Sequence, residues 1–216
     1  MSLLSYIFPQ TKLITSSKYN KLIRVNEEYG KYKLLVNGSR QSGEYIRKLW
    51  QYAFDQFQIN KFLQISNILV LGTAGGTVIH LLYDLYPQAK IIGVDIDKVM
   101  LGIGQKYFGL DKVKDLSLVN EDAKLWTKRA VKQKLRFDLI IIDLFSGREI
   151  PEFVLQKSFL TDLKILLNAN GRVVINYLWE LKYQQKSEVL FEILKETFTH
   201  VSDTRIARNR FFLAKK

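Results

Sequence analysis

Hydrophobic and polar positions change their pattern along the chain near residue 45. From residue 66 onward, short runs that are apolar throughout alternate with longer stretches of helical spacing. The strand-like runs are 68–71, 90–94, 116–120, 139–142 and 172–176, and the helix-like stretches are 76–86, 98–108, 123–132 and 156–167. Strands that are apolar on both faces and alternate with helices predict a parallel sheet covered by helices.

The two ends of the chain extend this prediction. Leu49, Tyr52, Ala53 and Phe57 recur at helical spacing and predict a helix over 44–58, and 182–197 predicts a last helix. Two final runs, 200–205 and 210–214, are joined by a short connection and should pair antiparallel. We therefore predict an α/β fold with a doubly wound, mostly parallel, seven-stranded sheet.

The first 40 residues have a different character. Apolar-containing runs at 13–14, 21–26 and 32–36 are separated by turn-forming residues, which predicts a small antiparallel unit of two or three strands. We expect residues 1–44 to form an N-terminal β-hairpin region and residues 45–216 to form the α/β domain.

Composition narrows the class of protein. The chain of 216 residues has no cysteine and two histidines, which excludes thiolate zinc sites and disfavours a multi-histidine site, so we expect no metal. No apolar run approaches the roughly 18 to 20 residues that span a bilayer, and no basic segment precedes the apolar N-terminal stretch. We expect a cytoplasmic protein without membrane association.

The formal charge of +12 favours anionic partners. A basic run between Lys124 and Arg136 is either a solvated face or a weak contact for nucleic acid or phosphate. Composition alone leaves both interpretations open.

A glycine-rich segment follows the first strand of the predicted sheet. The run 68–71 leads into Gly72-Thr73-Ala74-Gly75-Gly76-Thr77 and then into a helix. Such a turn lets the backbone approach a ligand closely, and the helix N-terminus offers free N–H groups to an anion. The same segment could also be an ordinary tight turn.

Acidic residues follow the next three strands. Asp95 could accept hydrogen bonds from ribose hydroxyls, whereas Asp97 could cap the next helix. Asp122 could accept an adenine amino group or cap a helix, and Asp143 ends the fourth strand. Ligands bind beyond the carboxyl ends of parallel strands, so we predict that these residues and Gly72 line one edge of the sheet.

This order of motifs resembles spermidine synthase and its relatives, which are aminopropyltransferases on the class I S-adenosylmethionine-dependent methyltransferase fold. The similarity covers about residues 20–180, and the run 143–151 is most similar to a divergent spermidine synthase-like branch. On the N-terminal side, 36–43 is similar to the family's hairpin end. Trp50-Gln51-Tyr52 stands where the family has an aromatic residue, His or Gln, and Glu.

The resemblance implies a site for decarboxylated S-adenosylmethionine or S-adenosylmethionine as group donor. It implies that Asp143 is catalytic, because the family keeps there a carboxylate that orients and helps to deprotonate the attacking amine. The implied donor-binding residues are Gly72, Gly75 and Gly76 near the nucleoside, Asp95 on the ribose, Asp122 and Ala123 at the adenine, Ile96 on its ring, and Gln41 and Gln51 near the sulfonium.

Departures from the family concern the acceptor. Ala74, Ser146 and Tyr52 stand where the family usually has acids, and fewer carboxylates should weaken attraction of a cationic diamine. Glu44, Glu149 or Glu152 could replace them.

The predicted function is transfer of an aminopropyl group to an amine acceptor. The alternatives are S-adenosylmethionine-dependent methyl transfer to an acceptor that the sequence does not identify, or non-catalytic binding of a nucleoside or nucleic acid. The expected partner is a small-molecule amine or another nucleophilic acceptor. A homodimer is one option for the assembly.

Overall fold

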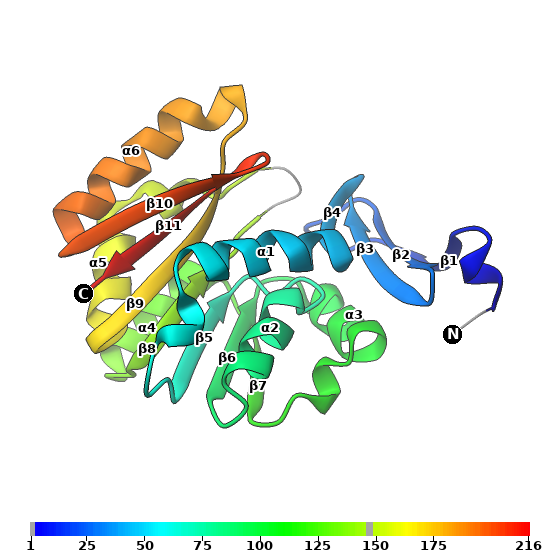
Figure 1. The fold of residues 1–216 in the computed structure, drawn as a ribbon, viewed down its shortest axis with the longest axis horizontal. Coiled ribbons are helices and arrows are strands. Elements are labelled where there is room, and N and C mark those ends of the chain that lie inside the picture. Colours follow the sequence, from blue (N-terminus) through cyan, green and yellow to red (C-terminus); the bar gives the residue numbers. More distant parts are fainter. Residues whose placement is uncertain (1–2, 146–148) are drawn as a thin grey trace.

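The computed structural model describes residues 3–145 and 149–216, and these residues form two sheets (Figure 1). The order of the larger, seven-stranded sheet in this part of the chain is β10-β11-β9-β8-β5-β6-β7. Its strands are β5 (Asn67–Leu71), β6 (Lys90–Asp95), β7 (Leu116–Asn120), β8 (Phe137–Ile142), β9 (Leu167–Leu178), β10 (His200–Ile206) and β11 (Asn209–Lys215). Strands β5 to β9 pair in parallel, and β11 pairs antiparallel with both β9 and β10.

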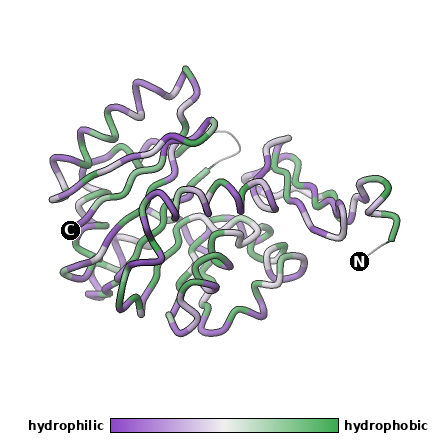
Figure 2. Tube along the Cα trace, viewed as in Figure 1, coloured by the Kyte–Doolittle hydropathy of each residue, from purple (hydrophilic) through white to green (hydrophobic). Residues whose placement is uncertain are grey.

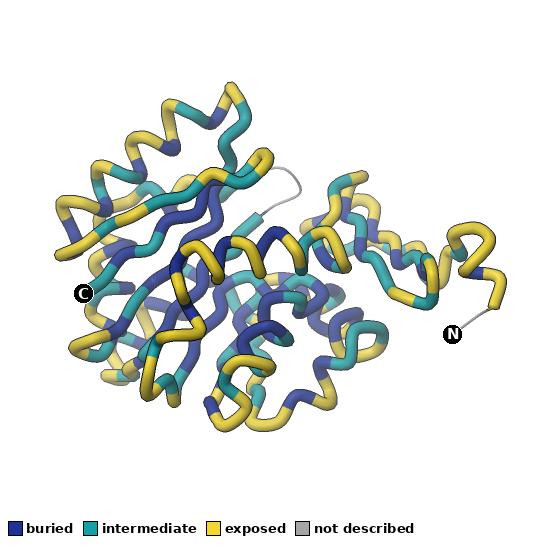
Figure 3. Tube along the Cα trace, viewed as in Figure 1, coloured by how far each residue is buried: buried dark blue, intermediate teal, exposed yellow. Residues whose placement is uncertain are grey.

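Helices cover both faces of this sheet. They are α1 (Glu44–Gln56), α2 (Thr77–Leu85), α3 (Lys98–Phe108), α4 (Ala123–Lys132), α5 (Lys157–Leu166) and α6 (Leu181–Thr197). Buried side chains of α4, α5 and α6 pack on one face, and those of α1 and α2 pack on the other. The central strands are hydrophobic along their length and buried (Figures 2 and 3), which confirms the predicted doubly wound fold.

The smaller sheet packs beside the glycine-rich loop that follows β5. Its antiparallel strands are β1 (Gln10–Thr15), β2 (Ile23–Glu28), β3 (Lys31–Val36) and β4 (Ser39–Ser42). Buried Ile23 and Leu34 pack against Met100 and Ile103 of α3. The small sheet is thereby held over the carboxyl ends of the parallel strands.

Two details differ from the sequence prediction. The small sheet has four strands in the described part of the chain, because β4 has the sequence SRQS and so carries no hydrophobic signal. Strand β9 begins at Leu167 and includes residues 168–171, which precede the predicted strand-like run 172–176. The pairing of β8 with β9 shifts register there, so the polar segment is accommodated as an irregularity of the strand.

Short 3-10 turns complete the described chain: η1 (Leu3–Tyr6), η2 (Ile59–Lys61), η3 (Leu110–Lys112) and η4 (Glu152–Leu155). Across the described residues, we find no helix with both the length and the apolar character that crossing a membrane requires.

Candidate functional site: an acidic cavity joined to an open cleft

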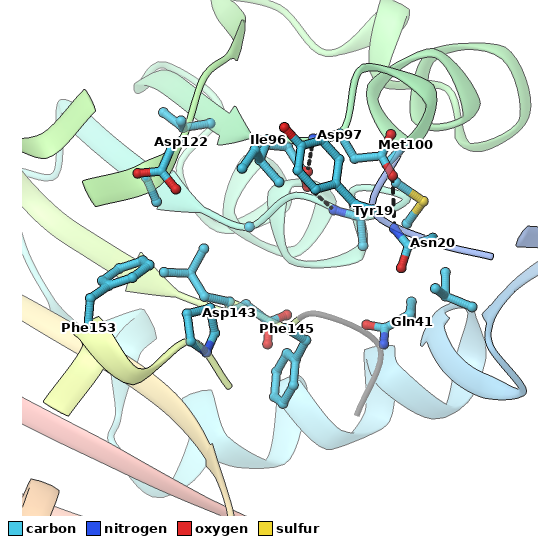
Figure 4. Close-up of a pocket in the computed structure, with 18 residues that line it drawn as sticks. Tyr19, Asn20, Gln41, Ile96, Asp97, Met100, Asp122, Asp143, Phe145 and Phe153 are labelled. Atoms are coloured by element: carbon cyan, nitrogen blue, oxygen red, sulfur yellow. Dashed lines mark hydrogen bonds between the residues drawn. The ribbon is translucent and has the colours of Figure 1, made fainter. Parts of the chain in front are cut away.

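A cavity of about 190 Å³ lies at the carboxyl ends of the parallel strands, beneath the small sheet (Figure 4). Its wall contains four aspartates and, among the described residues, no lysine or arginine. The lining residues are Tyr19, Asn20, Val36, Gln41, Gly72, Ala74, Val94, Asp95, Ile96, Asp97, Met100, Asp122, Ala123, Asp143, Leu144, Phe145, Pro151 and Phe153. The site therefore has the electrostatic character of a cation-binding cavity.

Gly72 allows two strand ends to approach each other at the floor of the cavity. Its φ is 87°, and a Cβ atom here would lie 2.1 Å from the backbone oxygen of Asp143. The backbone N–H of Asp143 donates to Leu71 O at 2.8 Å, which holds the end of β8 against the glycine turn. Glycine is required here for close packing as well as for conformation.

Asp95 anchors the glycine-rich loop. Its Oδ2 accepts hydrogen bonds from Thr73 N at 3.0 Å, Thr73 Oγ1 at 3.1 Å and Ala74 N at 3.1 Å, and its Oδ1 accepts one from Asp97 N at 2.9 Å. Burial raises the pKa of Asp95, although these hydrogen bonds act in the opposite direction. The Oδ1 atom retains capacity to accept a further hydrogen bond from a ligand.

Asp97 links the cavity to the N-terminal region. Its Oδ1 accepts from Val99 N at 3.0 Å and caps α3, as the sequence analysis allowed. Its Oδ2 accepts from Asn20 Nδ2 at 2.8 Å and from the Ser17 hydroxyl. Asn20 and its neighbour Tyr19 are cavity residues that the sequence analysis missed, because a contact across 77 residues leaves no local pattern.

Asp122 caps a helix, which is one of the two roles that the sequence left open, and it also lines the cavity. Its Oδ1 accepts from Leu125 N at 3.0 Å and caps α4, while the residue also lines the cavity beside Ala123. Ile96 is 38% exposed although it is aliphatic. In Figure 4, Asp122 and Phe153 lie toward one end of the cavity, Gln41 and Asn20 lie toward the other, and Ile96 lies between them.

Asp143 receives hydrogen bonds on both carboxylate oxygens. Asn176 Nδ2 donates to Oδ1 at 2.8 Å, and Trp50 Nε1 donates to Oδ2 at 3.3 Å. Burial raises the pKa of Asp143 to about 6, against the lowering effect of both donors. The sequence analysis missed Asn176, although this residue ends the predicted strand-like run 172–176. The reasoning that placed Asp143 at the carboxyl end of a strand, where ligands bind, applies to Asn176 as well.

A second, more open cleft of about 690 Å³ adjoins the cavity. It lies between β4, α1, the end of β9 and the turn between β10 and β11. Gln41, Asp143 and Phe145 line both spaces. Asp143 therefore stands at the junction, where it can reach a group in either space.

Three of the sequence-predicted donor residues do not line the cavity in the described structure. The Gly75 N–H donates to Ser42 Oγ at 2.9 Å, and Gly76 packs against Leu110. Gln51 is exposed, because α1 turns its neighbour Trp50 into the core. Gln41, Gly72, Asp95, Ile96, Asp122, Ala123 and Asp143 line the cavity together, whereas these three positions lie outside it in the described structure.

The acids that could replace the family's acceptor carboxylates are paired with lysines. Glu44 lies 2.9 Å from Lys31, Glu149 lies 3.0 Å from Lys182, and Glu152 lies 2.9 Å from Lys186. Within the described chain, none of these three glutamates lines either space. Ser146, the remaining position of interest, lies outside the described residues.

The basic run on α4 is less uniform than its sequence implies. Arg129 forms an ion pair with Glu121, while Lys128 and Lys132 are exposed. Across the described residues, we find no group of three or more His, Cys, Asp or Glu side chains arranged to hold a metal ion.

Comparison with known proteins identifies the family and the fold class of the chain. Residues 65–211 match a family model described as a methyltransferase domain, so the chain belongs to the methyltransferase-domain family. Its structure resembles a probable spermidine synthase from Corynebacterium glutamicum, with a TM-score of 0.77, 18% identity and coverage of 94% of this chain and 79% of that one. Together they confirm a spermidine synthase-like class I S-adenosylmethionine fold.

Two curated relatives show how broad this class is. The chain is 34% identical over 111 residues to a polyamine aminopropyltransferase of Vibrio vulnificus, across 51% of this chain and 37% of that protein. It is 28% identical over 117 residues to an eEF1A lysine and N-terminal methyltransferase homolog of Drosophila melanogaster, across 51% of this chain and 17% of that protein. The match thus covers well under half of either relative, and it supports an S-adenosylmethionine-dependent transferase.

Proposed function

We propose that the chain transfers a methyl group from S-adenosylmethionine to a nucleophile in the open cleft, with Asp143 as general base. The observation that carries this proposal is the position of Asp143 at the junction of the two spaces, with its pKa raised to about 6. A carboxylate with that pKa is largely ionised at neutral pH and is still basic enough to take a proton during transfer.

The residues of the acidic cavity fit the donor. Four aspartates favour a cationic sulfonium, and Gly72 lets the backbone ends of β5 and β8 approach each other at the floor of the cavity. Asp122 and Ile96 would hold the adenine, Asp95 Oδ1 the ribose, and Gln41 the region of the sulfonium beside Asp143. When bound, the donor supplies an alkyl carbon that is already activated by its positively charged sulfur.

The chain's contribution to the chemistry is positioning and proton removal. Asn176 and Trp50 hold the two oxygens of Asp143 in a fixed orientation. One lone pair on either oxygen remains for the N–H or O–H of an acceptor in the cleft. Asp143 takes the acceptor proton, which leaves the lone pair of the nucleophile directed at the donor in the neighbouring cavity.

The acceptor side supports methyl transfer over aminopropyl transfer to a diamine. The cleft is lined by three cationic side chains, Arg40, Lys182 and Arg208. It is lined by only two carboxylates, those of Asp143 and Glu180. A second ammonium group would enter a space where cations already outnumber acids, at an electrostatic cost. Ala74 also presents no carboxylate that would repel the carboxylate of S-adenosylmethionine.

Aminopropyl transfer is the second candidate. It is favoured by the 34% identity with the Vibrio vulnificus protein, whose name describes that activity. The donors of the two reactions differ in the α-carboxylate, which S-adenosylmethionine carries and decarboxylated S-adenosylmethionine lacks.

Two parallel assays test the proposal. One supplies S-adenosylmethionine with pooled amines and measures S-adenosylhomocysteine, and the other supplies decarboxylated S-adenosylmethionine and measures methylthioadenosine. We expect product in the first assay, together with tight calorimetric binding of S-adenosylhomocysteine. Turnover confined to the decarboxylated donor would instead establish the second candidate, and failure to bind any adenosyl thioether would refute both.

A further inference from the structure

Three cationic side chains line the open cleft, against two carboxylates. Arg40 comes from β4, Lys182 from the start of α6, and Arg208 from the turn between β10 and β11. Three separate segments of the chain thus bring a cation to the space next to Asp143. The cavity on the other side of Asp143 has no lining cation among the described residues.

The three cations differ in how far they are neutralised. Lys182 is 3.0 Å from Glu149, and Arg208 is 3.8 Å from Glu180, a separation at the outer limit of an ion pair. Arg40 lies over the ring of Tyr45 at 5.3 Å and forms no ion pair with a carboxylate of the described chain. Its guanidinium is exposed at the cleft and is available to a ligand.

The turn that carries Arg208 is connected to the general base. Asn209 Nδ2 donates to Asn176 Oδ1 at 2.8 Å, and Asn176 Nδ2 donates to Asp143 Oδ1 at 2.8 Å. The Arg208 backbone oxygen also accepts from Trp179 N at 2.8 Å. These contacts hold the backbone of Arg208 at a defined position relative to Asp143.

We propose that the acceptor carries an anionic group, a carboxylate or a phosphate, which binds at Arg40 and Arg208 while its nucleophilic atom faces Asp143. Arginine binds both kinds of oxyanion through paired N–H donors, and such charge-assisted hydrogen bonds are strong. The anion would neutralise Arg40 and complement the weakly paired Arg208. This proposal rests on the proposed function and specifies its substrate class.

The test uses four amines of equal chain length that differ at the far end. They are 3-aminopropanoate, 3-aminopropyl phosphate, propylamine and 1,3-diaminopropane, titrated by calorimetry into protein saturated with S-adenosylhomocysteine. Saturation is verified first, so a protein that does not bind S-adenosylhomocysteine refutes the proposed function rather than the acceptor class. The comparison of the two anionic amines decides between carboxylate and phosphate.

We expect one or both anionic amines to bind at least about ten-fold more tightly than propylamine, with the diamine weakest. Arg40→Gln and, separately, Arg208→Gln should remove that preference without changing S-adenosylhomocysteine affinity. Lys128→Gln, which removes an exposed cation on α4 outside both spaces, should leave the preference intact.

Three results would overturn the proposal: binding of the diamine equal to that of the anionic amines, an anion preference that survives both arginine substitutions, or no detectable binding of any of the four amines.

Discussion

Replacing Asp143 with asparagine tests the central step of the proposed reaction. The substitution keeps the size of the side chain and removes its basicity. A correctly placed general base contributes about 10²- to 10⁴-fold to rate, so we expect kcat to fall by that factor in Asp143→Asn. The amide oxygen of the variant can still accept from Asn176, whereas its amide nitrogen cannot accept from Trp50 Nε1.

The pH dependence of kcat/KM provides a second test of Asp143 as general base. With a pKa of about 6, Asp143 is ionised in roughly nine tenths of the molecules at pH 7 and in about one tenth at pH 5. The acidic limb of kcat/KM should therefore have its midpoint near pH 6 in the wild-type protein. An ordinary exposed aspartate would place that midpoint near about pH 4.

The assay follows S-adenosylhomocysteine formation from about pH 4.5 to 9, a range that brackets both midpoints, with the best acceptor found. Asp111→Asn is the matched control, because Asp111 is an exposed aspartate outside both spaces and should leave the profile unchanged. Binding of S-adenosylhomocysteine, whose sulfur is uncharged, should stay within a few-fold of wild type in both variants. Full activity in Asp143→Asn, or a wild-type acidic limb at the position of an ordinary aspartate, would refute the assignment of Asp143 as base.

Further substitutions test the surroundings of the base and the donor cavity. Asn176→Leu removes a donor that lowers the pKa of Asp143, so the acidic limb should move to higher pH; an unchanged profile would contradict this. Gly72→Ala should destabilise the fold by about 2 kcal/mol or more in urea denaturation, whereas Gly102→Ala, with open space at its Cβ, should not destabilise it. Asp122→Ser should preserve the helix cap and the stability but lower S-adenosylhomocysteine affinity by about 1.5 to 3 kcal/mol in calorimetry.

Burial of Asp143 also predicts how stability depends on pH. Because its pKa is about 6 in the folded protein against an ordinary 3.8, the folded state binds the proton more tightly than the unfolded state does. The stabilisation from this group is complete below about pH 4 and is lost as pH rises through 6. In denaturant titrations, Asp143→Asn should therefore lose less stability between about pH 4 and pH 7 than the wild-type protein does.

The main sheet could be predicted because its strands are buried on both faces. The run 116–120 coincides with β7, and 68–71 and 90–94 each fall within one residue of β5 and β6. In the small sheet, only one face is buried, and the predicted run 21–26 is displaced by two residues from β2 (Ile23–Glu28). The signal is weaker there because alternation in a short strand is easily obscured by lysines and serines.

Residues of the candidate site also differ in how well the sequence predicts their positions. The sequence could predict the positions of three aspartates, because each stands at or just after the end of a strand that is visible in the sequence. They are Asp95, Asp122 and Asp143. Asn20 and Arg40 reach the site from the N-terminal sheet, whose placement depends on Ile23 and Leu34 packing against α3. Such tertiary placement cannot be deduced from spacing along the chain.

The two halves of the site are also constrained differently by the fold. In the cavity, Asp95 accepts hydrogen bonds from the backbone of Thr73 and Ala74, and Asp97 and Asp122 each cap a helix. Replacing any of these carboxylates with a residue that cannot cap or accept should cost stability as well as the proposed donor binding. On the acceptor side, the side chains of Arg40 and Arg208 are exposed and hold no such backbone groups. A change of charge there should leave the fold intact, so under the proposed function the acceptor class can change while the cavity is retained. Under the proposed function, this asymmetry would allow a chain with a spermidine synthase-like fold to combine an acidic cavity for the donor with a basic cleft for the acceptor.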